Sequence, residues 1–171
     1  KIMGLEPRIL SRQIMQGTDP EKIAGKSAGH PGTGLVFDRR YMDHSLEYGH
    51  PESPERLRAI IRRLGSAGLD KALRMIAPSV DPIPYIRMVH PERHIALVAK
   101  QAHDESICRL AVSGALSAVD AVCAGEVENA FCAVRPPGHH AADAGEYGFC
   151  FYNNVAIAAR YAREKHRLSR I

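Results

Sequence analysis

Tryptophan is absent from this sequence and aromatic residues make up only 6% of it, so aliphatic side chains must fill most of its core. No run of apolar residues approaches the roughly 18–20 needed to cross a membrane, which argues against a membrane protein. No run of Lys or Arg stands out and the net charge is only +4, so direct nucleic-acid binding is not expected. No two cysteines have C-x-x-C spacing, which disfavours a zinc site built from cysteines.

The few cysteines that are present sit mostly among apolar neighbours. Such thiols are typical of small buried side chains in a reducing compartment, and the sequence therefore predicts a cytoplasmic protein. The residues concerned are Cys108, Cys123, Cys132 and Cys150.

The length of 171 residues and the 45% hydrophobic content suit one domain with a sizeable core. Residues 1–32 are rich in Gly and Pro and weakly patterned, so we expect an N-terminal arm or tail there. The domain is expected to begin at Thr33 and to include residues 33–171.

Short apolar runs alternate with helical patterns along the rest of the chain. Strands are predicted over residues 34–38, 74–78 and 129–134, and the helices at 54–64, 83–88, 92–101, 105–124 and 152–166. Ser53 is a good N-cap for the first of these helices, and Pro54 a good first residue. This alternation predicts an α/β fold with a parallel sheet, in which loops at the carboxyl ends of strands carry the site.

The most unusual loop follows the predicted strand at 129–134 and holds His139 and His140 directly after Pro-Pro-Gly. Prolines fix the backbone that enters the turn, and glycine allows a close approach. Histidine exchanges protons near neutral pH, so one ring can take a proton from water while the other donates to a leaving group. The alternative is that the pair is ordinary exposed polar surface.

Other polar residues have plainer interpretations. His90 and His94 have an i, i+4 spacing that can bind metal, but no carboxylate or cysteine completes a ligand set, and His90 can simply cap a helix. His44 and His50 are expected at a polar surface or rim. Glu52 is expected to be a solvated loop carboxylate, with a place at the entrance of the site as the alternative. A solvated basic face is expected at the end of the last helix, with phosphate binding as the alternative; the residues are Arg160, Arg163, Lys165, Arg167 and Arg170.

Two long motifs, Arg-Pro-Pro-Gly-His-His-Ala at residues 135–141 and Gly-Phe-Cys-Phe-Tyr-Asn-Asn-Val-Ala-Ile-Ala-Ala at 148–159, closely resemble the zinc-dependent histone deacetylase superfamily. The form is that of the class II enzymes and of the bacterial acetoin-utilisation and acetylpolyamine amidohydrolase proteins. Residues 33–38 and 49–60 resemble the start of the same domain. The resemblance implies an arginase–deacetylase-like fold, a central parallel sheet flanked by helices, of which residues 33–171 form the N-terminal half.

The resemblance also implies a function, the hydrolysis of acetyl-lysine or of a related acetylated amine such as an acetylpolyamine, with Zn²⁺ as cofactor. By resemblance, His140 is the general base and His139 the electrostatic partner or general acid. The other residues that match the family's substrate site are Gly148, whose carbonyl accepts from the substrate amide, Phe149 in the acyl-lysine channel, Arg56 near its inner end and Asp104 at its rim.

The sequence departs from the family in three places. It stops before the Asp-x-Asp-x-His strand that supplies zinc ligands, so those ligands are expected beyond its C-terminus. It has fewer residues than usual between Asp104 and Arg109, and His94 stands where the family usually has tyrosine. The chain alone is therefore expected to be inactive and to self-associate through an exposed sheet edge. The alternative is a naturally truncated, non-catalytic remnant or partner-binding chain.

Overall fold

The computed structural model of the chain describes residues 32–44, 46, 49–102, 104–142 and 149–171. The arm expected over residues 1–32 lies outside these ranges except for Gly32. All statements below refer to the described residues, which form the unit from Pro31 to Ile171.

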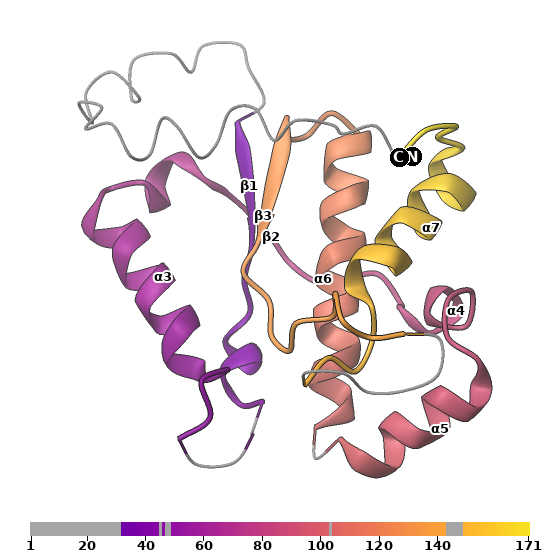
Figure 1. Ribbon diagram of the computed structural model, residues 1–171. Coiled ribbons are helices and arrows are strands. Elements are labelled where there is room, and N and C mark those ends of the chain that lie inside the picture. Colours follow the sequence, from indigo (N-terminus) through magenta and orange to yellow (C-terminus); the bar gives the residue numbers. More distant parts are fainter. Residues whose placement is uncertain (1–31, 45, 47–48, 103, 143–148) are drawn as a thin grey trace, which may run out of the picture. The chain divides into compact units, whose positions relative to one another are not determined.

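A three-stranded parallel sheet forms the middle layer (Figure 1). Its order is β2-β1-β3, with β1 (Thr33–Val36) between β2 (Arg74–Ile76) and β3 (Asn129–Cys132). Leu35 lies opposite Met75 on one side and opposite Phe131 on the other. The first of the described strands is therefore the central one, and the connections to its neighbours cross over through helices, as parallel strands require.

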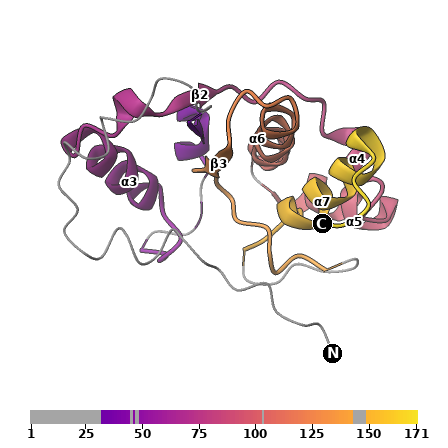
Figure 2. The ribbon, with the colours of Figure 1, turned by 90° about the horizontal axis from the view of Figure 1, so that it is seen from above.

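Helices cover both faces of this sheet (Figure 2). Helix α3 (Pro54–Ser66) lies on one side, and α6 (Glu105–Cys123) lies on the other and packs against all three strands. The shorter elements complete the layers: 3-10 turns η1 (Arg39–Met42) and η2 (Asp70–Ala72), and, beyond α6, helices α4 (Ile83–Ile86), α5 (Glu92–Gln101) and α7 (Asn154–His166).

The α/β fold predicted from the sequence is confirmed, and so are the helices predicted from apolar periodicity. Leu57 is buried on α3, and the apolar residues one and two turns later pack beside it against the sheet. Pro54 opens that helix as expected, whereas Ser53 occupies the N-cap position without a capping hydrogen bond from its side chain. The three strands are shorter than predicted, because pairing ends before the turn residues at their carboxyl ends.

Helix α6 is the core helix of the described chain. Val112 and Leu116 are fully buried toward α7, while Ala111 packs toward the sheet. A Cβ on Gly114 would come within 2.8 Å of Val36 and would also meet Tyr41, so glycine lets the helix approach β1. With 19 residues and a mean hydropathy of 1.5, α6 is also the one described helix that is long and apolar enough to cross a membrane, but core packing accounts for this composition.

Candidate functional site

The loop of residues 133–142 leaves β3 at the carboxyl end of the sheet, where α3 and α6 begin and η1 also lies (Figure 1). Parallel α/β sheets carry their sites at this end. Residues 149–153, which lead into α7, run beside the loop, since Asn153 Nδ2 donates to the Ala141 carbonyl at 3.0 Å.

A buried ion pair anchors the start of the loop. Arg135 binds the Glu52 carboxylate with two parallel bonds, Nε to Oε1 at 2.6 Å and Nη2 to Oε2 at 2.7 Å. Its Nη1 also donates to the carbonyls of Tyr41 at 3.1 Å and His44 at 3.3 Å. Charges this deep require such complete pairing, and a bidentate pair also fixes orientation. The pair ties the loop after β3 to the loop before α3.

The middle of the loop is held by close packing against the start of α7. A Cβ on Gly138 would lie 2.6 Å from the Asn154 nitrogen and would overlap the Tyr152 carbonyl oxygen, so only glycine fits. The Asn154 side chain donates to the Pro136 carbonyl at 3.3 Å, and the Arg135–Pro136 peptide bond is cis. The loop is thus fixed at several points on both sides of the two histidines.

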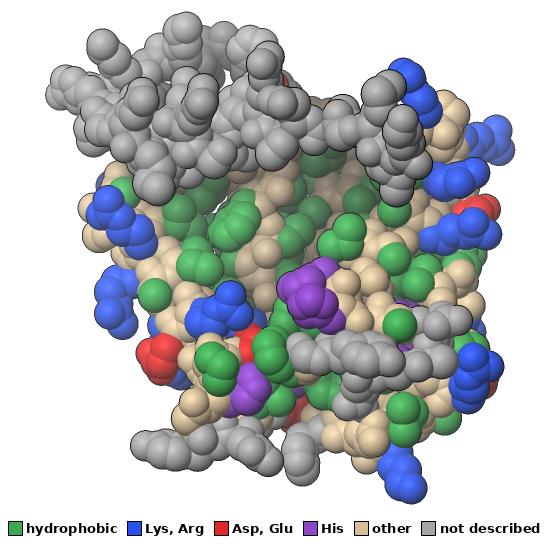
Figure 3. All heavy atoms as spheres, in the orientation of Figure 1, with side chains coloured by type: hydrophobic (Ala, Val, Ile, Leu, Met, Phe, Trp, Pro, Cys, Tyr) green, Lys and Arg blue, Asp and Glu red, His purple; other side chains and the backbone are tan. Residues whose placement is uncertain are grey.

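His139 and His140 are both exposed although the backbone beneath them is held tightly. Their ring centroids lie 4.2 Å apart with the planes tilted by 51°. Histidine side chains appear at the centre of the face shown in Figure 3, with hydrophobic side chains around them. Two adjacent, solvent-accessible imidazoles on a rigid loop can give and take protons at one bound molecule.

Phe149, predicted in the substrate channel, lies with its ring edge-on to His50, 4.8 Å between centroids. Its backbone is left-handed, with φ of 57°, and its side chain is partly exposed. The next residue, Cys150, is buried against the backbone of His140 and Ala141: burial raises the pKa of its thiol, and the hydrogen bonds from that backbone offset part of the rise. Gly148, the other predicted channel residue, lies outside the described residues.

The other two described residues predicted at the substrate site are Arg56 and Asp104. The Arg56 side chain is 62% exposed at the start of α3, with Nη1 4.0 Å from Glu52 Oε1, so it reaches the loop only through the Glu52–Arg135 pair. Asp104 occupies the N-cap position of α6, and its charge opposes the lowering of the His44 pKa, which places it in the same region.

Two expectations were wrong. Glu52 is not solvated, and His44 is not a surface residue, since each is only 2% exposed. Burial, with the nearby charge of Arg135, lowers the pKa of His44, and neither of its ring nitrogens has a hydrogen-bond partner among the described residues. Both residues are covered because Arg135, 83 positions after Glu52, folds onto them. No local pattern around residues 44–52 could have revealed that partner.

The described residues do not provide a metal site. No group of three or more His, Cys, Asp or Glu side chains among them could hold an ion. His90 and His94, whose spacing suits a metal, are instead buried and stacked on each other. A zinc site of the type the family uses would need ligands from outside the described ranges.

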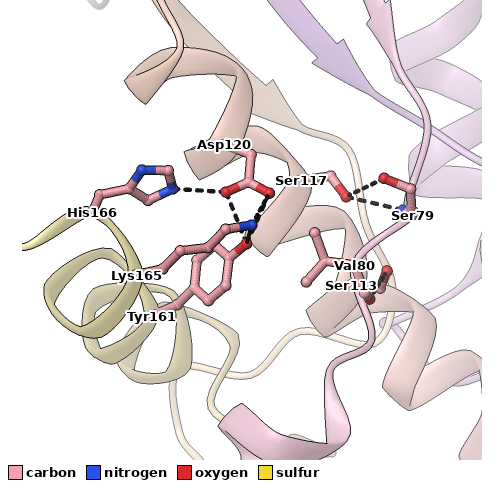
Figure 4. Close-up of polar contacts among 8 residues, drawn as sticks. All are labelled: Ser79, Val80, Ser113, Ser117, Asp120, Tyr161, Lys165 and His166. Carbon is pink, nitrogen blue, oxygen red and sulfur yellow. Dashed lines mark hydrogen bonds and ion pairs between the residues drawn. The ribbon is translucent and has the colours of Figure 1, made fainter.

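A second polar cluster joins α6 and α7, away from the loop (Figure 4). Asp120 accepts hydrogen bonds from Tyr161 at 2.8 Å, Lys165 at 3.0 Å and His166 at 2.7 Å. Burial opposes ionisation of Asp120, but these bonds outweigh it and lower its pKa, while burial raises the pKa of Tyr161 to about 12. The basic end of this helix is exposed, as expected, and Lys165 within it is also paired with Asp120 across the two helices.

The cysteines agree with expectation only in part. All four are free thiols, and Cys108 and Cys150 are buried, but Cys132 is only partly buried and Cys123 is exposed at the end of α6.

Comparison with known proteins gives consistent matches. The profile of the Histone deacetylase domain matches residues 50–171. Over 165 residues the chain is 36% identical to the Polyamine deacetylase HDAC10 of Rattus norvegicus, covering 82% of this chain and 28% of the relative. Histone deacetylase 15 of Arabidopsis thaliana is 32% identical, with 84% and 30% covered. The crystal structure of the HDA15 HD domain superposes with a TM-score of 0.71 at 32% identity, over 77% of this chain and 43% of that one. The chain thus spans less than a third of these curated relatives.

Proposed function

Because the chain belongs to the histone deacetylase domain family, we propose that it is part of a zinc-dependent amidohydrolase that removes acetyl groups from lysine side chains or polyamines. Residues 33–171 would form the N-terminal half of the catalytic domain. Relatives named as polyamine and histone deacetylases support the substrate class. The observation that carries the proposal is the loop fixed by Arg135 and by Asn153, which presents His139 and His140 to solvent.

In this proposal the two histidines divide the proton transfers of amide hydrolysis. His140 takes a proton from the attacking water, and His139 stabilises the charge that develops or donates a proton to the leaving amine. Phe149 offers an aromatic wall to the acyl chain, and Asp104 lies near the rim. Zinc would be held by residues outside those described. The four free thiols support a reducing, cytoplasmic setting.

The test is acetate release from an acetylated lysine peptide and from an acetylated polyamine, measured on the protein with the complete deacetylase domain. His140→Ala should lower kcat/KM by about 10²–10⁴-fold, the usual loss for a general base. His166→Ala, in the separate α7 cluster, is the matched control and should stay within about threefold, a kcat/KM change of under 1 kcal/mol. Equal activities of the two variants would reject the role of His140.

A second candidate is a non-catalytic, partner-binding chain, and the lack of a metal-ligand set among the described residues favours it for these 171 residues alone. The chain by itself should release no acetate from either substrate in the presence of zinc. Robust turnover by the isolated chain would refute the proposal that its zinc ligands lie elsewhere.

A further inference from the structure

Two histidines that the proposed reaction does not use are buried together behind the candidate site. His90 follows α4 and His94 lies in the first turn of α5, and each is only 1% exposed. Their rings stack almost in parallel, 4.4 Å between centroids with 17° between the planes. Polar rings this deep are normally hydrogen-bonded, and two charged rings stacked so closely would repel each other.

Both rings bind the backbone of one segment. His94 Nε2 lies 2.7 Å from the Phe151 carbonyl oxygen, which can only accept, so this nitrogen donates. The Asn153 backbone N–H donates to His90 Nε2 at 3.0 Å, so that nitrogen carries no proton. The geometry therefore requires opposite protonation at equivalent atoms: Nε2–H in His94, and a neutral ring with its proton on Nδ1 in His90.

The segment they hold is the one that secures the end of the tandem-histidine loop. Asn153 Nδ2 donates to the Ala141 carbonyl at 3.0 Å, next to His140. Its Oδ1 accepts from the Ala156 N–H at 3.0 Å and so caps α7. Asn153 thus hydrogen-bonds to the buried ring of His90, to the N-terminus of α7 and to the tandem-histidine loop.

We propose that His90 and His94 form a backbone clamp on Phe151 and Asn153 and act as positioning residues for His139 and His140. The loop's role in catalysis rests on the proposed function, but the clamp itself rests only on the contacts above. Both rings act on the backbone of Phe151 and Asn153, and so they act on the loop through another segment. A pair of histidines that merely fills space would have no reason to adopt opposite tautomers.

The first test determines the tautomers of His90 and His94 by NMR. The ¹⁵N-labelled chain at neutral pH gives long-range ¹H–¹⁵N correlations that show which ring nitrogen carries each proton, with signals assigned by their loss in His90→Gln and His94→Gln. We expect Nδ1–H in His90 and Nε2–H in His94. A proton on Nε2 of His90 would overturn the clamp.

The second test separates the hydrogen bond from packing. His90→Leu removes the acceptor, whereas His90→Gln keeps one, and His166→Leu is the control away from the clamp. We expect amide hydrogen exchange at Asn153 to become about tenfold faster in His90→Leu, the loss of one net hydrogen bond, with shifted signals from His139 and His140. His90→Gln should recover most of the protection, and His166→Leu should leave it unchanged.

Equal behaviour of the Leu and Gln variants would show that only ring volume matters and would overturn the proposal. If His90→Leu fails to fold, the tautomers measured in the wild-type chain still show whether the clamp exists. These readouts need neither zinc nor substrate. If the protein with the complete deacetylase domain releases no acetate but the chain shows the expected tautomers, the proposed function is rejected and the clamp is supported. If that protein is active but Nε2 of His90 carries a proton, the clamp is rejected and the proposed function is supported.

Discussion

Arg135 and Glu52 place a full positive and a full negative charge in the interior at the base of the tandem-histidine loop. Three further hydrogen bonds from Arg135, to the backbone carbonyls of Tyr41, His44 and Glu52, would be lost or rearranged if the loop moved. Removing two charges from water offsets most of their attraction, so the pair adds little to the free energy of unfolding. Its main effect is to select one position of the loop. Exposed His139 and His140 depend on residues that do no chemistry themselves.

Removing one partner of this pair should be costly. Arg135→Met leaves the Glu52 carboxylate buried and uncompensated, and we expect the free energy of unfolding to fall by about 3–5 kcal/mol. The exposed pair Arg87–Glu92, 3.4 Å apart, provides the control: Arg87→Met should change stability by less than about 1 kcal/mol. Urea unfolding curves measure both, and similar losses in the two variants would contradict the interior role of Arg135.

Two glycines should respond oppositely to the same substitution. Gly138→Ala forces a Cβ into the backbone of Tyr152 and Asn154, so it should destabilise the chain and displace the loop. Gly65→Ala places its Cβ in open space within α3 and should stabilise by about 0.5–1 kcal/mol, since alanine is the better helix former. Thermal unfolding of the pair tests this, and a neutral Gly138→Ala would show that the loop is not packed as described.

His44 makes stability depend on pH. Its pKa is lowered by burial and by Arg135, so below about pH 6.5, the value for a free imidazole, the unfolded chain binds more protons than the folded one. Stability is thus fully present above about pH 6.5 and falls as the pH drops toward the folded pKa. His44→Leu should flatten this slope between pH 5 and 7 in urea titrations. An unchanged slope would show that His44 is not buried as a neutral ring.

At the scale of elements, patterns within one helix predict well and contacts between elements do not. Helix α5 runs over Glu92–Gln101 as predicted, because its period and flanking proline are local signals. The partners of Asp120 on α7 lie more than 40 positions away, and the residue pattern within neither helix predicts these contacts. The spacing of His94 to His90 suggests a metal ligand because it is visible in the sequence, whereas the carbonyl that His94 binds is 57 positions distant.

The junction of α6 and α7 should weaken in acid. The pKa of Asp120 is lowered overall, with burial opposing the bonds from Lys165, Tyr161 and His166. The contribution of Asp120 to the free energy of unfolding is therefore fully present above about pH 3.9, the ordinary pKa of Asp. It is lost as the pH falls through the lower pKa that Asp120 has in the folded chain. Asp120→Asn should reduce the pH slope of unfolding below pH 4, and an equal slope in variant and wild type would contradict this role.

For the whole molecule, the fold class followed from the sequence, and so did the position of the candidate loop at the carboxyl end of a strand. The motif at residues 135–141 marked the loop because its composition is unusual by itself. The sequence does not predict which side chains hold this loop in place, namely Glu52, His44 and the His90–His94 clamp. These side chains act through partners that only the tertiary fold brings near, so residue type alone suggested surface or metal-binding roles for them.

Strand β3 pairs with β1 on one side, and no described strand lies on its other side. Phe131 in this strand is 45% exposed, so we expect the isolated chain to self-associate through the edge. Phe131→Lys should shift the chain toward monomer in analytical ultracentrifugation, because edge charges oppose strand pairing. Val155→Lys, at an exposed position of α7, is the control and should not shift the chain toward monomer. Monomeric wild-type chain would contradict the expectation.

The strand order also bears on how the chain folds during synthesis. Of the three described strands, β1 leaves the ribosome first and lies between the other two, which follow roughly 40 and 95 residues later. At about 5–20 residues per second, β1 waits several seconds before β3 is available, with Leu35 and Val36 uncovered. Chaperones that capture short apolar segments on nascent chains should therefore bind this strand, and slowing translation between residues 77 and 128 should prolong that binding.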